Sequence, residues 1–426
     1  MQLVAYGAQD IYLTGNPQIT FFKVVYRRHT NFAMEAIEQT ISGSVAVNGS
    51  TVSSTISRNG DLVGRLWLDV KLDSTGMGGS STYANWTNNT GHAFLKECEV
   101  EIGGQKIDKH YSQWLDIWNE LTDHDESEWI GLNKHAAKNA YLKSTSSAVG
   151  PVSDQRVYVP LQFWFCRNPG LALPLIALQY HEVKVKLTTR PMISLVNSAG
   201  TLAEGTPKNP ALKLWADYIY LDTDERRRFA QVSHEYLIEQ VQKESGAMST
   251  SQKLTFNHPV KELIWVVQDD TVTAQQLHAS TTADATLNET GAMANGNDYF
   301  NYTSNLTSAG AEQIAGVSCS ESFATAKLVL NGHDRFAARK ASYFRLCQPI
   351  QAGHKVPTKH IYNYSFALKP EEHQPSGTCN FSRIDNANLL FTRDSGSYSG
   401  DTLSVYAVNY NVLRIMSGMG GLAYSN

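Results

Sequence analysis

The sequence predicts an all-β protein that consists of two tandem β-sandwiches or jelly rolls of one topology. Three observations lead to this prediction. Apolar and polar residues alternate along 66–72, 97–102 and 183–188, which is the period of half-buried strands. Turn-forming pairs such as Asn59-Gly60 and Asn331-Gly332 separate such runs at short intervals, as in sandwiches and jelly rolls. A weak internal repeat relates the two halves of the chain.

The internal repeat has a spacing of about 200 residues, which indicates a duplicated structural unit. The triplet Ile-Glu-Gln at 37–39 returns at 238–240, and Trp67 has a counterpart in Trp265. The block 157–187 matches 361–391, since each begins with an aromatic strand, passes a turn that contains proline and ends in a strand. We therefore expect two equivalent sandwiches, with Trp67 and Trp265 at equivalent positions.

The second copy of the repeat contains an insertion. The chain runs 37 residues from Trp67 to Gly104 but 67 residues from Trp265 to Gly332, so the second copy gains 30. The extra stretch, around 269–318, is rich in Thr, Ala and Asn and shows no sustained apolar period. We expect a solvent-facing loop on the outer surface that has little to bury.

Residues 109–143 do not follow the β pattern. The first copy of the repeat also contains an insertion, which coincides with these residues. Trp114, Trp118 and Leu121 recur at helical spacing, and Trp129 and Leu132 do the same further along. This spacing predicts two short helices.

Composition and charge exclude several classes of protein. The 426 residues have a hydrophobic fraction of 42%, enough for a sizeable core. The net charge is −4, so the chain lacks the overall positive charge that is typical of nucleic-acid binding. The first 20 residues show no signal-peptide pattern, and the longest apolar run is too short to span a bilayer. No CxxC pair occurs among the five cysteines, which favours free thiols in a reducing cytosol; they are Cys98, Cys166, Cys319, Cys347 and Cys379.

No motif points to catalysis, to a cofactor or to a metal ion. The chain contains no phosphate-binding loop ending in Gly-Lys-Ser/Thr, no GxSxG and no HExxH, the motifs of nucleotide, hydrolase and zinc sites. The pairs His181-Glu182 and His234-Glu235 lack the second histidine of a zinc helix. We interpret them as polar strand ends.

Three groups of charged residues remain. Glu97, Glu99 and Glu101 share one face of one strand, which favours a solvated or interface surface over the carboxylate pair of a glycosidase. The cluster 222–228 mixes both signs, so we favour a connector whose charges pair locally or across a subunit contact over a nucleic-acid site. The basic patch 26–29 has two open interpretations, contact with phosphate or with a neighbouring acidic surface.

Eight Asn-x-Ser/Thr triplets mark possible glycosylation sites; they begin at Asn48, Asn85, Asn88, Asn288, Asn301, Asn305, Asn363 and Asn380. Asn288, Asn301 and Asn305 cluster in the inserted loop, where a bulky sugar has space. We therefore predict these three as the glycan candidates, with an unmodified loop as the alternative.

Seven runs of the chain are similar to one known family. They are GAQDIYLTGNPQITFFKVVYRRHTNFA at 7–33, ISRNGDL at 56–62, EIGGQKIDKHY at 101–111, NPGLALPLIALQYHEVK at 168–184, FNHP at 256–259, FALKPEEHQPSGTCNFSRIDNA at 366–387 and NYNVLRIMSGMGGLAY at 409–424. Together they resemble the major capsid proteins of the large icosahedral nucleocytoplasmic DNA viruses, most closely those of the chlorella viruses (phycodnaviruses). The resemblance spans nearly the whole chain and weakens across 270–320 and 392–404.

The resemblance implies a double jelly roll, two tandem eight-stranded antiparallel units with short helical insertions. It implies a homotrimer of roughly hexagonal outline that tiles a shell around an internal membrane. Neighbouring capsomers and minor capsid proteins are then the partners, without direct contact to nucleic acid, and some members have surface glycans. The protein is expected in the virion, after synthesis and assembly in the host cytoplasm.

These observations divide the chain into four parts. We expect an N-terminal arm at 1–25, a first jelly roll at 26–221, a charged linker at 222–234 and a second jelly roll at 235–426. The expected function is that of a structural shell protein without enzymatic activity. Two alternatives stay open: a minor capsid paralogue at special lattice positions, which abundance in purified particles would reveal, and a jelly-roll carbohydrate-binding protein, which could be a monomer.

Overall fold

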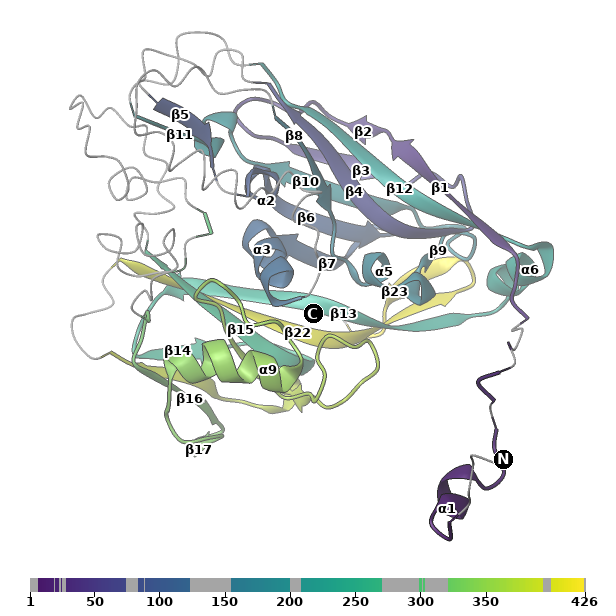
Figure 1. Cartoon of the computed structure of the whole chain (residues 1–426). Helices are drawn as coiled ribbons and strands as arrows, with labels where there is room; N and C mark the ends of the chain where they lie inside the picture. The colour runs from purple at the N-terminus through teal and green to yellow at the C-terminus, as the bar shows by residue number, and fades with distance from the viewer. Residues whose placement is uncertain are drawn as a thin grey trace, which may run out of the picture.

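Figure 1 shows the computed structural model of the chain. It describes residues 7–18, 20–22, 24, 28–73, 83–87, 89–122, 155–199, 208–269, 299–300, 302, 321–393 and 400–424.

The first half of the chain folds into two packed antiparallel sheets. One sheet has the order β1-β12-β4-β8, formed by β1 (Phe32–Gln39), β12 (Ala211–Leu221), β4 (Leu62–Leu72) and β8 (Gln155–Pro160), with β9 (Leu173–Pro174) also paired to β4. The other has the order β2-β3-β10-β6-β7, formed by β2 (Ile41–Ser42), β3 (Thr51–Thr55), β10 (Val183–Thr189), β6 (Leu95–Ile102) and β7 (Gln105–Tyr111). A separate ribbon pairs β5 (Tyr83–Trp86) with β11 (Val196–Ala199).

The second half repeats this arrangement. The order β13-β22-β15-β19 corresponds to β1-β12-β4-β8, and its strands are β13 (His234–Ala247), β22 (Asp401–Met416), β15 (Pro259–Asp269) and β19 (Tyr362–Ser365), extended by β20 (Cys379–Asn380) and β23 (Met419–Leu422). The order β14-β21-β16-β17 corresponds to β3-β10-β6-β7, and its strands are β14 (Ser251–Leu254), β21 (Ala387–Thr392), β16 (Thr325–Leu330) and β17 (His333–Asp334), with β18 (Arg339–Lys340) beside β16. Two eight-stranded jelly rolls in tandem are therefore confirmed.

The repeat identified equivalent strands but placed Trp67 in the wrong register. Trp67 lies on β4 and Trp265 on the corresponding β15. Trp265 is 0% exposed inside the second jelly roll, whereas Trp67 is half-buried and stacks on Trp215, with 5.6 Å between ring centroids. Successive strand residues face opposite sides, so an alignment shift of one residue exchanges core for surface. The core-facing residues beside Trp67 are Leu66 and Leu68.

The apolar core of the first jelly roll includes residues of the second, which also has a core of its own. Trp265 faces the core of its own sandwich, but its neighbours Ile264 and Val266 belong to the apolar cluster of the first jelly roll. Trp114 of helix α3 (Ser112–Leu121) packs on Tyr406 of β22, with 5.6 Å between ring centroids. In Figure 1, α3 and α5 (Trp164–Arg167) lie between the sheets of the first jelly roll and the strands β13, β22 and β15.

The other helices that the structure describes are short. Helix α3 confirms the first predicted helix, and the second, around Trp129 and Leu132, lies outside the described residues. The remaining helices are α1 (Asp10–Thr14), α2 (Thr90–Phe94), α6 (Thr223–Gln231) and α9 (Gln348–Ala352), and a π-helical turn spans Tyr343–Cys347. In the part of the chain that the structure describes, no helix is long and apolar enough to cross a membrane.

The connector between the jelly rolls is helical. Asp222 is the N-cap residue of α6, a position that aspartate favours, and its carboxylate accepts a hydrogen bond from the backbone N–H of Thr223. Arg226 pairs with Asp61 of the first jelly roll, with 2.9 Å between Nε and Oδ1. At least one charge of the cluster is thus paired within the chain.

Part of the inserted stretch 269–318 is buried, contrary to expectation. After β15 ends at Asp269, only residues 299, 300 and 302 of this stretch are described. Tyr299, Phe300 and Tyr302 are 8%, 3% and 0% exposed within the core shared by the two jelly rolls. The Tyr299 hydroxyl donates to the carbonyl oxygen of Ser194 at 3.0 Å. The insertion therefore contributes three aromatic anchors to the junction, which its lack of periodicity did not indicate.

The described cysteines are free thiols. They are Cys98, Cys166, Cys347 and Cys379, and Cys319 lies outside the described residues. Burial raises the pKa of the Cys98 thiol well above its usual range and that of Cys166 to about 12. Both thiols therefore stay protonated near neutral pH and act as small apolar side chains.

Candidate functional site

The residues considered for metal or acid–base chemistry have structural partners. The His181 Nδ1 lies 2.9 Å from the carbonyl oxygen of Gly420, and the His234 Nε2 lies 2.8 Å from that of Phe229. Among the described residues, no group of three or more histidine, cysteine, aspartate or glutamate side chains could hold a metal ion. The histidines thus connect strand ends to nearby backbone.

The acidic face of β6 is balanced by lysines of the adjacent strands. Glu97 pairs with Lys109 of β7 at 2.8 Å, and Glu101 pairs with Lys186 of β10. Burial, and then the hydrogen bond with Glu101, raise the pKa of Glu99. One sheet supplies all these charges, so the arrangement is a paired strand surface. In the N-terminal basic patch, the described Arg28 and His29 are exposed.

The predicted glycan positions are not described. Asn288, Asn301 and Asn305 all lie outside the described residues. Of the other triplets, Asn363 is 0% exposed on β19 and has no space for a sugar, whereas Asn48 and Asn380 are exposed.

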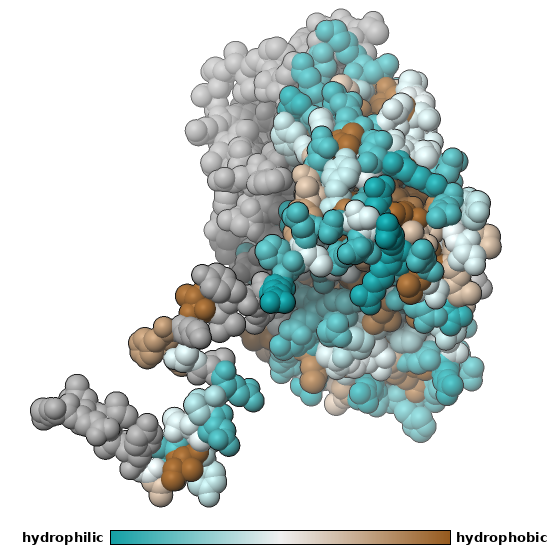
Figure 2. Space-filling view, turned by 90° about the vertical axis from the view of Figure 1, so that its right-hand side faces the viewer, coloured by the Kyte–Doolittle hydropathy of each residue, from teal (hydrophilic) through white to brown (hydrophobic). Residues whose placement is uncertain are grey.

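Large apolar side chains are exposed on the N-terminal segment and on β1. Tyr12, Phe21 and Phe22 are 92%, 90% and 99% exposed, and Figures 1 and 2 show this segment extending away from the two jelly rolls. On β1, which pairs only with β12 among the described strands, Phe32 and Met34 are also exposed. Large exposed apolar side chains in such a row mark an interaction surface.

A buried ionic junction lies where the first jelly roll meets the second. Asp116 of α3 is 0% exposed and accepts two hydrogen bonds of 2.7 Å from the Nζ of Lys359 and one of 2.9 Å from the hydroxyl of Tyr302. On the same helix, Glu120 accepts a 2.9 Å hydrogen bond from the hydroxyl of Thr358. A buried carboxylate is tolerated only where such partners replace water, so these contacts determine how α3 docks.

A second buried junction centres on Glu239 of β13. Its carboxylate accepts from the Nζ of Lys261 at 2.7 Å and from the guanidinium of Arg167 at 3.0 Å. Arg167 belongs to α5 of the first jelly roll and also covers the ring of Trp118 at 4.1 Å. The Nζ of Lys261 donates in addition to the carbonyl oxygen of Pro370.

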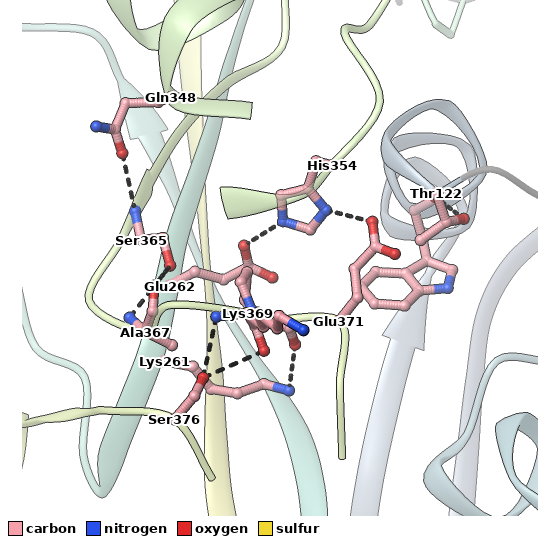
Figure 3. A network of polar contacts seen from close by, with 12 residues as sticks. Thr122, Lys261, Glu262, Gln348, His354, Ser365, Ala367, Lys369, Glu371 and Ser376 are labelled. Carbon is pink, nitrogen blue, oxygen red and sulfur yellow. Dashed lines mark hydrogen bonds and ion pairs between the residues drawn. The ribbon is translucent and has the colours of Figure 1, made fainter. Parts of the chain in front are cut away.

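Next to Lys261, a histidine bridges two carboxylates. Figure 3 shows His354 between Glu262 and Glu371, with 2.8 Å from Nε2 to Glu262 and 2.6 Å from Nδ1 to Glu371. Burial by itself lowers the pKa of His354, but the two carboxylates outweigh it and raise the pKa from 6.5 to about 9. The imidazolium therefore donates to both carboxylates near neutral pH, and Glu262, which is 0% exposed, keeps a counter-charge.

These buried networks could not be identified from sequence spacing. His354 and Glu262 are 92 positions apart, and Lys359 and Asp116 are 243 apart. Single histidines and lysines give no local signal, because their partners come from another strand or from the other jelly roll.

The bridge at His354 predicts a pH dependence of stability. Its pKa is higher in the folded than in the unfolded chain, so the stabilisation is complete below pH about 6.5 and is lost as pH rises through about 9, for a total of about 3 kcal/mol. Urea unfolding of the natural chain and of His354→Gln between pH 6 and 10 measures it. The variant is expected to lack this decline, while His333→Gln, at an exposed position of β17, retains it. Equal slopes for all three proteins would contradict the assignment.

Comparison with known proteins places these features in a family. A family model described as "Major capsid protein N-terminus" matches residues 20–222, and one described as "Large eukaryotic DNA virus major capsid protein" matches 225–421. The major capsid protein of Pyramimonas orientalis virus is 48% identical, over 100% of this chain and 99% of the relative. That of Paramecium bursaria Chlorella virus 1 is 45% identical over the same shares.

Solved structures agree with this grouping. A quasi-atomic model of the PBCV-1 virus capsid superimposes with a TM-score of 0.74 at 39% identity, and the match covers 96% of this chain and 100% of that one. The Faustovirus major capsid protein, at 14% identity and a TM-score of 0.72, shares the fold. Since the two family models cover nearly the whole chain and relatives well above 30% identity match it from end to end, this chain belongs to the family of large eukaryotic DNA virus major capsid proteins.

Proposed function

We propose that the chain is the structural unit of a viral shell, a homotrimer of pseudo-hexagonal outline that tiles the outer icosahedral capsid of a large DNA virus. The observation that supports this most is the pair of jelly rolls with one strand order, joined by an apolar cluster to which both contribute. Three such chains present six similar lobes, and a six-lobed outline packs on a hexagonal lattice. Its role is then structural rather than enzymatic.

We assign each part of the chain a role in the capsomer. We assign 1–25 to an arm at the base of the capsomer, 26–221 and 235–426 to the jelly rolls, and 222–234 to the connector. The exposed apolar side chains of the arm, including Phe21 and Phe22, suit contact with minor capsid proteins or with an internal membrane layer. Neighbouring capsomers are the other partners in the virion, and we place synthesis and assembly in the host cytoplasm, without direct contact to nucleic acid.

We also propose glycans in the inserted stretch 269–318, at Asn288, Asn301 and Asn305. These triplets lie in the stretch that the second copy gains over the first, while Asn363 is excluded by burial. Glycopeptide mapping of protein from virus particles should find sugar at one or more of the three asparagines. Peptides free of sugar at all three positions would refute this assignment.

The homotrimer is directly measurable. Light scattering of the purified chain at micromolar concentration should give three times 47.2 kDa, or about 142 kDa, for the protein part. We expect a trimer because the edge strand β1 exposes the apolar side chains of Phe32 and Met34, which need a partner. A monodisperse monomer would contradict the proposal and favour a carbohydrate-binding protein instead.

A further inference from the structure

A cavity of about 440 Å³ lies between the two jelly rolls. The first jelly roll contributes β6, the start of α3 and the residues after β10, and the second contributes β13, β15 and β22. The lining consists largely of charged, hydroxyl and amide side chains, with Tyr111 and Tyr299 as its aromatic walls. A cavity of this size at a domain junction is a common place for a small ligand.

The charge of the cavity is unbalanced. Three cationic side chains line it, Lys96, Arg190 and Lys243, against one carboxylate, Glu97. Glu97 is already paired with Lys109 of the adjacent strand, at 2.8 Å. Within the described ranges, Lys96 and Lys243 have no carboxylate partner, so the cavity has an excess of positive charge.

Two of the cations are held in place by the protein. The Arg190 guanidinium donates to the carbonyl oxygen of Ala93 at 2.6 Å and to the hydroxyl of Ser112 at 2.9 Å, and it lies 4.2 Å from the ring centroid of Tyr299. Its carbonyl, hydroxyl and ring contacts are uncharged, so none of them neutralises it. The Nζ of Lys243 lies 4.9 Å from the ring centroid of Tyr111.

The surroundings of Lys243 disfavour a lone ammonium group. Burial, and then the nearby charge of Arg190, lower its pKa, while Glu97 acts in the opposite direction. Burial also lowers the pKa of Arg190. A bound anion would relieve both the loss of water and the repulsion between the two cations. Of the hydroxyl groups that line the same cavity, that of Ser112 already donates to the carbonyl oxygen of His92. The hydroxyls of Ser245 and Ser404 share one hydrogen bond of 3.0 Å, so one proton of this pair is left as a further donor.

We propose that this cavity binds a small molecule through an oxyanion, a phosphate or a carboxylate group placed between Lys243 and Arg190. The ammonium group and the guanidinium donate charge-assisted hydrogen bonds to it, and the hydroxyl of the Ser245–Ser404 pair that keeps a free proton donates to a remaining oxygen. Because both jelly rolls contribute, the ligand would bridge the junction. This inference is independent of the proposed role in shell assembly.

Isothermal titration calorimetry of the purified full chain at pH 7 and low ionic strength tests the proposal, with inorganic phosphate and glucuronate as probes. We expect one site per chain for at least one probe. Lys243→Met keeps the aliphatic stem on the Tyr111 ring but removes the charge, so the affinity should fall about tenfold or more. Lys243→Arg should retain binding, and Lys253→Met, at an exposed position of β14 outside the cavity lining, should leave the affinity unchanged.

The outcomes separate clearly. Binding of phosphate alone assigns a phosphate ligand, and binding of glucuronate alone assigns a carboxylate ligand. If Lys243→Met does not fold, Lys96→Met at the exposed rim is expected to weaken binding by a smaller factor. The proposal fails if neither probe binds, or if Lys243→Met, or Lys96→Met in its place, binds as tightly as the natural chain.

Discussion

The structure depends on one packing constraint, the burial of both faces of the sheet β13-β22-β15-β19. On β15, Leu263, Trp265 and Val267 belong to the core of the second jelly roll, while Ile264 and Val266 belong to the apolar cluster of the first. An antiparallel sheet can leave one face in water, but this one has apolar side chains on both. The second jelly roll is therefore complete only when the first covers it.

This constraint explains why polar and charged groups lie at the junction. Apolar packing has no preferred direction, whereas Asp116 with Lys359 and Glu239 with Arg167 have defined geometries. Removing Lys359 would leave the buried charge of Asp116 without its cationic partner. We infer that the ionic contacts determine the orientation of the two lobes, and that the apolar core provides most of the stabilising free energy. A chain that tiles a shell needs such a fixed orientation, because an error at one junction repeats in every copy.

Sequence patterns predicted the strands well where one face is buried and the other is solvated. The alternation in β6 and β10 is of this kind, since their outer faces bear glutamates and lysines. In β15 both faces are apolar, so the sequence pattern does not show which residues face which side. The repeat alignment therefore matched Trp67 with Trp265, although Trp67 is half-buried and Trp265 is fully buried. Helix α3 was predictable because its tryptophans follow a helical period.

The site residues were harder to predict for a different reason. His354, Lys243 and Arg190 are single charged residues whose partners come from distant strands, and no local period marks them. Tyr299, Phe300 and Tyr302 interrupt a stretch rich in small polar residues, and their burial depends on the first jelly roll. Topology, rather than local composition, brings these groups together.

Native-state hydrogen exchange as a function of denaturant tests the central claim, that the two jelly rolls form one cooperative unit. Amides of α3 in the first jelly roll and of β15 and β22 in the second should open together, with exchange curves that merge at one free energy of unfolding. If α3 merges with β4 and β6 at one free energy while β15 and β22 merge at another, the jelly rolls unfold separately and the shared core does not unite them.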